Sequence, residues 1–417
     1  MFIGLLGGLS VACPVSVARE AQAVGQAADA AGLDLAASIE RAVDTHPSVE
    51  AAQAAARAAG ADLRSAKWQR FPSFSIEGLL IDQPRNPFQA QAVIAQPLWD
   101  AGRISGAIGR AEARKNAALA AYDEAVLSIA TSTAQAFLDV YRWRERVQVF
   151  TSSLEQHNRM VATMERRYAQ EVSPLSDLEL ARSRALQIEQ QLYQAKAQEG
   201  AASSRWRELV GDPFVPLGAL PDPPQAWPKF DDEQVTLQAL NFSPVLRRLR
   251  FDVAAASAEE RVARASILPQ LSGQYTYSEA FGHRVGLVLK AQSDGGLSRF
   301  TAAEAARLRI EASELQVAAG ERQIRNQLLA LLREYEAAAL RLEGSLSASA
   351  SARRVMESYM RQFTSGRRTW LDVMNAVRET NGAEIDASEA RISAQSALTR
   401  LLLLSGQWAP VASEDQP

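Results

Sequence analysis

The chain is poor in the residues that build disulfide and metal sites. It has one cysteine, Cys13, and three histidines in 417 residues. A single cysteine excludes an internal disulfide framework and a cysteine-based metal cluster. His46, His157 and His283 lie far apart and lack the His-x-x-x-His or Glu-x-x-His spacing of metal ligands. We therefore expect no metal and no cofactor.

Strong charge and long hydrophobic runs are also missing. The formal net charge is -3 and no long basic block occurs, so the footprint of a nucleic-acid-binding protein is absent. Beyond the N-terminal segment no run of about 18 apolar residues exists, which excludes a transmembrane helix. A protein exported without such a helix is soluble in the periplasm, secreted, or held in an outer membrane by strands.

The N-terminal residues 1–23 are typical of a secretory signal region. The stretch is apolar and ends in small residues, although it lacks the usual positive start. Cleavage is expected after Ala18 or Ala23. A less favoured alternative is a lipoprotein acylated at Cys13, because Ser10 stands where a leucine or valine is usual.

The rest of the chain is a duplication. Four landmark pairs recur at a shift of 194 to 197 residues: the prolines Pro72 and Pro269, the aspartates Asp100 and Asp294, the aspartates Asp177 and Asp372, and the glycines Gly211 and Gly406. This regularity predicts a first structural repeat over residues 33–211 and a second over residues 231–406. A proline-rich connector, residues 212–230, separates them, and residues 407–417 form a tail.

Each repeat has the same predicted order: a helix ended by a proline, a β-hairpin, a long helix and a return helix. The predicted hairpins, long helices and return helices are 72–98, 103–168 and 174–210 in the first repeat, and 269–292, 297–363 and 369–405 in the second. The long helices contain no proline, and their apolar residues repeat every 3.5 positions, which favours coiled-coil packing. At 1.5 Å per residue each would extend about 100 Å.

The hairpins alternate apolar and polar residues, which is the pattern of strands with one apolar and one polar face. The apolar positions are Phe74, Ile76, Leu80, Leu271, Tyr275 and Tyr277. Periodicity alone equally allows a soluble hairpin packed on a core. If the strands face lipid, the sheet must close on itself, and four strands are too few. The chain must then oligomerise, with two copies giving eight strands and three giving twelve.

The doubled order of these motifs resembles the TolC-like outer membrane channel-tunnel proteins of Gram-negative bacteria. The resemblance covers about Leu33 to Gly406 and includes QPLWDAG, SPLSDLELA, FTSGRRTWLDVMNA and LLLLSG. It implies a mainly α fold with a small membrane β-sheet. In that fold the duplicated long-helix repeat forms a trimeric α-helical barrel, continued by a shared 12-stranded β-barrel with four strands per chain.

The resemblance implies a passive exit duct in the outer membrane that extends into the periplasm, not an enzyme. Its expected partners are two further copies in a homotrimer, a periplasmic adaptor (membrane fusion protein), an inner-membrane ABC transporter or alternatively an RND pump, and outer membrane lipid. Two segments, SPLSDLELARSRALQIEQQL and GGLSRFTAAEAARLRIEASE, resemble members that serve type I secretion of adhesins. Multidrug efflux is the first alternative, and a soluble periplasmic coiled-coil scaffold is the second.

The two breaks between long and return helices are the candidate site. By position, the resemblance places Asp372 in an acidic constriction ring and Asn375 at a second ring position. It assigns a closing latch to Arg368, with Asp177 and Ser176 as partners and Phe363 where a tyrosine hydroxyl is usual. The expected adaptor-contact tips are Val172, Ser173, Pro174, Leu175, Gly366, Arg367 and Thr369.

Helix capping offers a plainer interpretation of the same residues. Ser173-Pro174 and Thr369 have the pattern of helix starts, where Asp177 and Asp372 would be mildly stabilising. Capping and gating are compatible. A catalytic carboxylate pair is disfavoured, because no nucleophile or metal ligand surrounds either aspartate in the sequence.

Overall fold

The computed structural model describes residues 32–80, 88–221, 224, 227–278, 282–291 and 296–408. Cys13, the expected signal region and residues 409–417 of the tail lie outside this part. The chain forms two compact units, which we describe separately. The sheet unit comprises Thr45–Thr131, Pro228–Ala337 and the residues from Ala397 onward. The turn unit comprises the described residues before Thr45, together with Ser132–Trp227 and Ala338–Ser396.

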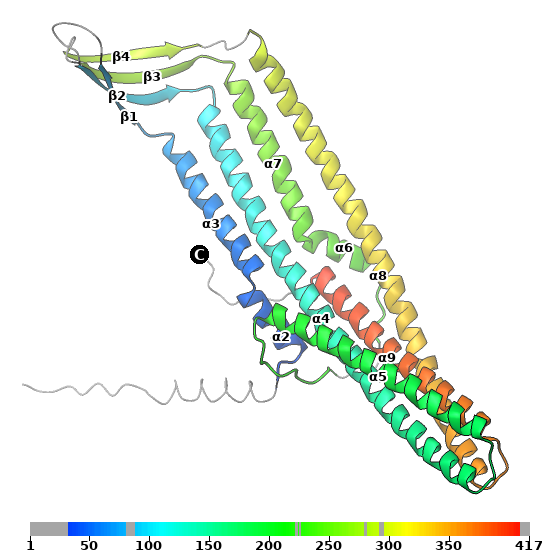
Figure 1. Ribbon diagram of the computed structural model, residues 1–417. Helices are drawn as coiled ribbons and strands as arrows, with labels where there is room; N and C mark the ends of the chain where they lie inside the picture. The colour runs from blue at the N-terminus through cyan, green and yellow to red at the C-terminus, as the bar shows by residue number, and fades with distance from the viewer. Residues whose placement is uncertain are drawn as a thin grey trace, which may run out of the picture. The chain divides into compact units, whose positions relative to one another are not determined.

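The described elements follow the same order in both halves of the chain (Figure 1). The first half has α2 (Leu35–Thr45), α3 (Pro47–Trp68), β1 (Ser73–Leu80), β2 (Phe88–Trp99), α4 (Arg103–Ala169) and α5 (Leu175–Val210). The second has α6 (Asp232–Phe242), α7 (Pro244–Ala265), β3 (Gln270–Ser278), β4 (Gly282–Lys290), α8 (Ser298–Thr364) and α9 (Trp370–Ser405). The fold class predicted from the sequence, mainly α with a small four-stranded sheet, is confirmed.

The sequence analysis did not predict the short helices α2 and α6, which precede α3 and α7. Each ends just before a proline, Pro47 or Pro244, that begins the next helix. Proline suits the first helical position because its missing N–H has no partner there anyway. Ser243 caps α7 by accepting the Leu246 N–H at 3.3 Å.

In the sheet unit, the four strands form one antiparallel sheet in the order β1-β2-β3-β4. The register aligns Phe74 with Ile94, Ile94 with Tyr275, and Tyr275 with Val285. Directly opposed residues share a face of the sheet, and residues two apart along a strand do so as well. Phe74, Ile76, Leu271, Tyr275 and Tyr277 therefore lie on one apolar face. Leu80 aligns with Phe88 at the far end of the same hairpin.

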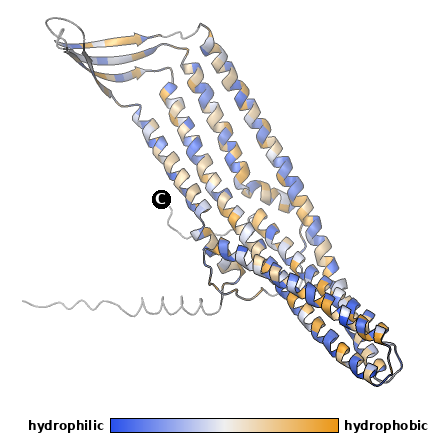
Figure 2. Cartoon of the chain, in the orientation of Figure 1, coloured by the Kyte–Doolittle hydropathy of each residue, from blue (hydrophilic) through white to orange (hydrophobic). Residues whose placement is uncertain are grey.

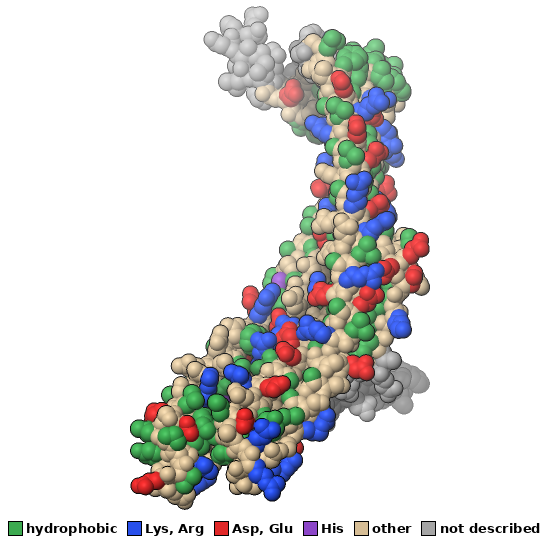
Figure 3. Space-filling model, turned by 90° about the vertical axis from the view of Figure 1, so that its right-hand side faces the viewer, with side chains coloured by type: hydrophobic (Ala, Val, Ile, Leu, Met, Phe, Trp, Pro, Cys, Tyr) green, Lys and Arg blue, Asp and Glu red, His purple; other side chains and the backbone are tan. Residues whose placement is uncertain are grey.

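This apolar face is open to the surroundings of the chain. Phe74 is 66% exposed and Val285 is 85% exposed. Figure 2 shows the hydrophobic positions along the strands, and Figure 3 shows hydrophobic side chains gathered at the sheet while charged side chains cover the helices. Within the described residues, β1 and β4 each pair with one strand only, so both sheet edges are open.

The helices of the sheet unit approach one another closely through small residues. Ala66 of α3 packs with Ile104 and Ile108 of α4. On the other side of α4, a Cβ at Gly106 would lie 2.9 Å from the Val262 side chain of α7. Ion pairs reinforce the α4–α7 contact, such as Arg110 with Glu259 at 2.6 Å.

In the turn unit, α5 and α9 pack against the C-terminal parts of α4 and α8. A buried cluster joins all four helices, and its members include Met164, Leu178, Phe363, Trp370 and Val373. Burial of such side chains is the main force that holds the four helices together.

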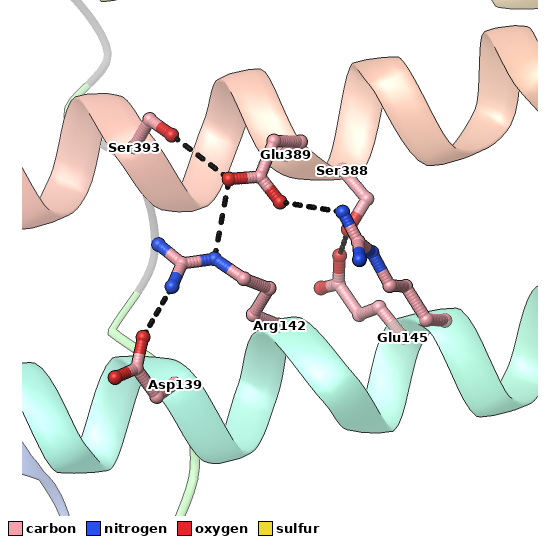
Figure 4. Close-up of polar contacts among 7 residues, drawn as sticks. Asp139, Arg142, Glu145, Ser388, Glu389 and Ser393 are labelled. Atoms are coloured by element: carbon pink, nitrogen blue, oxygen red, sulfur yellow. Dashed lines mark hydrogen bonds and ion pairs between the residues drawn. The ribbon is translucent and has the colours of Figure 1, made fainter. Parts of the chain in front are cut away.

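Charged side chains connect α4 to α9 in the same unit. Figure 4 shows Arg142 and Glu145 of α4 reaching toward Glu389 and Ser388 of α9. The Arg142 guanidinium lies 3.2 Å from the Glu389 carboxylate, and Ser388 donates a hydrogen bond to Glu145. Burial raises the pKa of the neighbouring Asp139, although Arg142 and Arg205 oppose the shift.

None of the described helices combines the length and the apolar character that crossing a membrane requires.

Candidate functional site: the two helix turns

Two short turns at the end of the turn unit connect the long helices to the return helices. The first turn, residues 170–174, joins α4 to α5, and the second turn, residues 365–369, joins α8 to α9. The turns are equivalent under the duplication, because α4 and α8 end at 169 and 364, and α5 and α9 begin at 175 and 370, a shift of 195 in both cases.

Both turns use the same backbone hydrogen bonds. In the first turn, Val172 N–H donates to the Arg167 carbonyl at 2.9 Å, and Glu171 N–H donates to the Tyr168 carbonyl at 2.9 Å. In the second, Arg367 N–H donates to Gln362 at 2.9 Å and Gly366 N–H donates to Phe363 at 3.0 Å. This pair of bonds is the Schellman ending of a helix, which requires a left-handed residue just past the helix.

The left-handed residues differ in type. Gly366 has φ of 72°, which glycine adopts freely. Its equivalent Glu171 has φ of 59°, where a side chain is strained. The first turn thus carries a carboxylate at a position that favours glycine.

The return helices also start differently. At α9, Thr369 and Asp372 cap each other: the Thr369 hydroxyl and N–H donate to the Asp372 carboxylate at 2.8 and 3.3 Å, and Asp372 N–H donates back to the hydroxyl at 3.3 Å. This is a capping box. At α5 the cap residue is Pro174, and no side chain accepts there.

The expected cap at Ser173 is therefore wrong. The Ser173 hydroxyl instead accepts a hydrogen bond from Arg167 Nε at 3.0 Å. The Arg167 guanidinium also lies 5.5 Å from the centre of the Phe363 ring, a cation–π contact between the two halves of the chain. Sequence reasoning missed Arg167, because nothing in its own surroundings indicates a partner nearly two hundred residues away.

Arg368 is held by residues of its own half. Its Nε donates to the Gln362 side chain at 3.3 Å, its guanidinium lies 4.4 Å from the Tyr359 ring centre, and Nη1 lies 3.9 Å from Asp372. Within the described part of a single chain, no interaction joins Arg368 to Ser176 or Asp177. Both of those residues lie in the first turn of α5.

The remaining predicted residues lie around the turns. Phe363 is buried, and Asn375 is exposed and accepts a hydrogen bond from Arg378 at 3.4 Å. Val172 is 58% exposed and Leu175 is 50% exposed. Tyr168, Val172 and Pro174 contribute to an open hollow of about 680 Å³ at the first turn.

The side chains of these turns are suited to contact with a partner. Within the described residues, no group of His, Cys, Asp or Glu side chains is arranged to hold a metal ion. The side chains on offer are exposed apolar groups, fixed arginines and carboxylates near helix N-termini.

Part of the chain matches a known protein family. The family model described as "Outer membrane efflux protein" matches residues 38–212, most of the first repeat. No curated protein matches the sequence significantly.

Solved structures share the fold over nearly the whole chain. The CmeC outer membrane channel of Campylobacter jejuni is 14% identical with a TM-score of 0.79, covering 91% of this chain and 87% of its own. VceC of Vibrio cholerae is 18% identical with a TM-score of 0.75, covering 89% and 96%. The open state of the Neisseria gonorrhoeae MtrE channel is 15% identical with a TM-score of 0.75, covering 92% and 91%. The first repeat thus matches the outer membrane efflux protein family, and the chain as a whole has the fold of these outer membrane channels.

Proposed function

We propose that the protein is the outer membrane duct of a tripartite export system and works as a homotrimer. Three chains supply twelve strands to one shared β-barrel, and their long helices form a tunnel in the periplasm. A periplasmic adaptor and an inner-membrane pump complete the system.

The sheet supports this proposal most directly. It has one exposed apolar face, and both of its edges are open within the described residues. An open edge in hydrocarbon leaves backbone N–H and C=O groups without partners, at a cost of several kcal/mol per group. Pairing β1 of one chain with β4 of the next removes both edges at once, which favours a closed ring of chains.

The proposal is tested on protein purified from outer membranes. We expect SDS-resistant trimers that conduct ions in planar lipid bilayers. A monomer recovered from the soluble periplasmic fraction would overturn the proposal and favour the periplasmic scaffold instead.

For the cargo, type I secretion of adhesin-like proteins is our first candidate, on the two segments that resemble secretion members. Multidrug efflux is the second. Cross-linking in cells followed by identification of the captured pump distinguishes them. An ABC transporter would support secretion, and an RND pump would support efflux.

Within the duct, we propose that the two turns form the periplasmic mouth. Asp372 and Asn375 line the constriction, Arg368 works with Ser176 and Asp177 as the latch, and the exposed residues of both turns contact the adaptor. Because Arg368 meets neither latch partner inside one chain, the latch contacts are expected between chains. Site-directed photo-cross-linking from Val172 or Arg367 is expected to capture the adaptor, whereas cross-linking from the buried Val377 is not.

A further inference from the structure

The end of α3 that leads into the sheet carries a row of exposed cations and aromatic rings. Arg64, Lys67 and Trp68 are spaced i, i+3 and i+4, so they share one face of the helix. Phe71 extends this row past the end of α3, because its ring centre lies 4.9 Å from that of Trp68. All four side chains are exposed, while Ala66 on the other side of α3 is buried against α4. The row therefore points away from α4.

The cations at this end of α3 lack partners of opposite charge. Within the described residues, the side chains of Arg64, Lys67 and Arg70 form no ion pair and no hydrogen bond. Arg70 borders a hollow of about 210 Å³ that Trp99 and Asp100 also line. The Asp100 carboxylate already accepts two backbone N–H groups at the start of α4. The three positive charges are therefore left for an anion from outside the chain.

The second repeat keeps two of these cations. A shift of 197 residues places Arg261 and Arg264 at the positions of Arg64 and Lys67, and both arginines are exposed. The negative end of the helix dipole accounts for a basic residue in the last turn, which is Lys67 in α3 and Arg264 in α7. It does not account for Arg64 and Arg261, which lie before the last turn, because the effect of the dipole fades beyond it.

The start of α4 adds a cation at the same level of the fold. Arg103 is the first residue of α4, where the positive helix end disfavours a positive side chain. Its Nε is buried and has no hydrogen-bond partner in the described part of the chain. Positive charge thus gathers where helices join the sheet, although the formal net charge of the whole chain is -3. We call these residues the junction cations: Arg64, Lys67, Arg70, Arg103 and Arg261.

We propose that the junction cations bind the phosphate headgroups of anionic glycerophospholipids in the periplasmic leaflet. The inference rests on the proposed duct, which places the sheet in the membrane and the helices in the periplasm. The rings of Trp68 and Phe71 then lie at the headgroup level, where aromatic side chains concentrate. Clustered Lys and Arg side chains beside a membrane-spanning segment attract anionic lipid. Such lipids fix how deeply the sheet sits in the bilayer.

Two lipids with the same acyl chains test the role of headgroup charge. The purified trimer in detergent receives dioleoyl phosphatidylglycerol, which is anionic, or dioleoyl phosphatidylcholine, which is neutral overall. Native mass spectrometry measures the lipids retained, and heating measures the temperature at which the trimer dissociates. We expect the anionic lipid to bind more tightly and to raise that temperature more, and added salt to weaken both effects.

Removing the charges of α3 tests the residues. The Arg64→Gln, Lys67→Gln, Arg70→Gln triple variant should bind the anionic lipid about fivefold more weakly for each cation removed, with the neutral lipid unaffected. The charge-retaining Arg64→Lys, Arg70→Lys variant should bind nearly as the wild type does.

A matched control removes three positive charges elsewhere. It replaces exposed arginines of α3 and α8 that lie farther from the sheet: Arg57→Gln, Arg325→Gln and Arg354→Gln. This variant has the same net charge as the junction variant and should keep wild-type binding of the anionic lipid. Equal losses in the two triple variants would reduce the effect to net charge and overturn the proposal.

The outcomes separate this inference from the proposed function. If the wild type forms conducting trimers but retains both lipids alike, the lipid site is wrong and the duct stands. If free glycerol phosphate stabilises the trimer as well as the anionic lipid does, the site takes a soluble anion and the inference fails. If the junction variant weakens the trimer equally with either lipid, this face packs against the partner subunit instead. If no trimer forms in the wild type, the duct itself is refuted.

Discussion

The two helix turns have nearly the same backbone and very different side chains. Both end a long helix with the same pair of hydrogen bonds, and both start a return helix after an identical number of residues. The second turn has glycine at the left-handed position and a capping box at the helix start. The first turn has Glu171 and an uncapped proline start. Duplication preserved the path of the chain, and the side chains then diverged.

The packing below the turns diverged in the same way. Leu175 and Trp370 hold equivalent first positions in α5 and α9, but Leu175 is 50% exposed and Trp370 is 7% exposed. The second repeat therefore contributes more of the buried cluster of the turn unit. The second turn is anchored by this packing, while the first offers more apolar surface to a partner.

Replacing Trp370 and its equivalent Leu175 with alanine should give the largest difference in stability between the two turns. Trp370→Ala is expected to destabilise the fold by about 3–5 kcal/mol, because it leaves a large cavity in the buried cluster. Leu175→Ala should change stability by less than about 0.5 kcal/mol, as expected for an exposed site. Thermal unfolding of the detergent-solubilised protein measures both. Equal losses would show that the two turns are anchored alike.

Replacing Arg368 of the second turn should open the proposed periplasmic mouth of the duct. Arg368→Ser loses the contacts with Gln362, Tyr359 and Asp372, so the second turn is less firmly held. We expect a several-fold rise in single-channel conductance in planar bilayers. Arg354→Ser, on the exposed side of α8, is the control. Unchanged conductance for Arg368→Ser would contradict the latch assignment.

The left-handed positions should respond unequally to alanine. Gly366→Ala places a Cβ where only glycine is relaxed and should cost about 1–2 kcal/mol. Glu171→Ala exchanges one strained side chain for another and should cost much less in the isolated turn. The difference in unfolding temperature between the two variants measures this asymmetry. A similar loss for both would mean that the Glu171 side chain itself stabilises the first turn.

The smallest expected effect is a pH dependence of stability that comes from a histidine of the first repeat. His157 is buried in α4 and its Nδ1–H donates to the Ser153 carbonyl at 2.8 Å. Burial lowers the pKa of His157 below its ordinary 6.5, and Arg184 adds to this, while the Ser153 bond opposes it. Below pH 6.5 the unfolded chain therefore binds a proton that the folded chain does not, so stability falls until the lowered pKa is reached.

His157→Gln should remove this loss. The equivalent position in the second repeat, 195 residues later, is Ala352 and cannot titrate. Unfolding temperatures of wild type and variant, compared at pH 7.5 and at pH 5, give the measurement. The wild type should lose more stability than the variant over this interval. Parallel behaviour would assign the pH dependence to other groups.

Much of the fold could be predicted from local patterns in the sequence. Heptad spacing indicates long paired helices because side chains 3.5 positions apart share one face. Alternation in 270–278 indicates a strand because successive side chains point to opposite faces. The second turn was also readable, since Thr369 and Asp372 have the spacing of a capping box. The short helices α2 and α6, which end just before Pro47 and Pro244, were not predicted.

The sequence by itself determined the duplication, the kinds of element and their order, because these follow from short-range periodicity and from prolines that cannot continue a helix. Only the tertiary structure decided which side chains meet. Arg167 contacts Phe363, Ser173 accepts from Arg167 rather than capping α5, and Glu171 rather than glycine takes the left-handed position. Such contacts depend on how helices distant in sequence pack, and no local spacing encodes that packing.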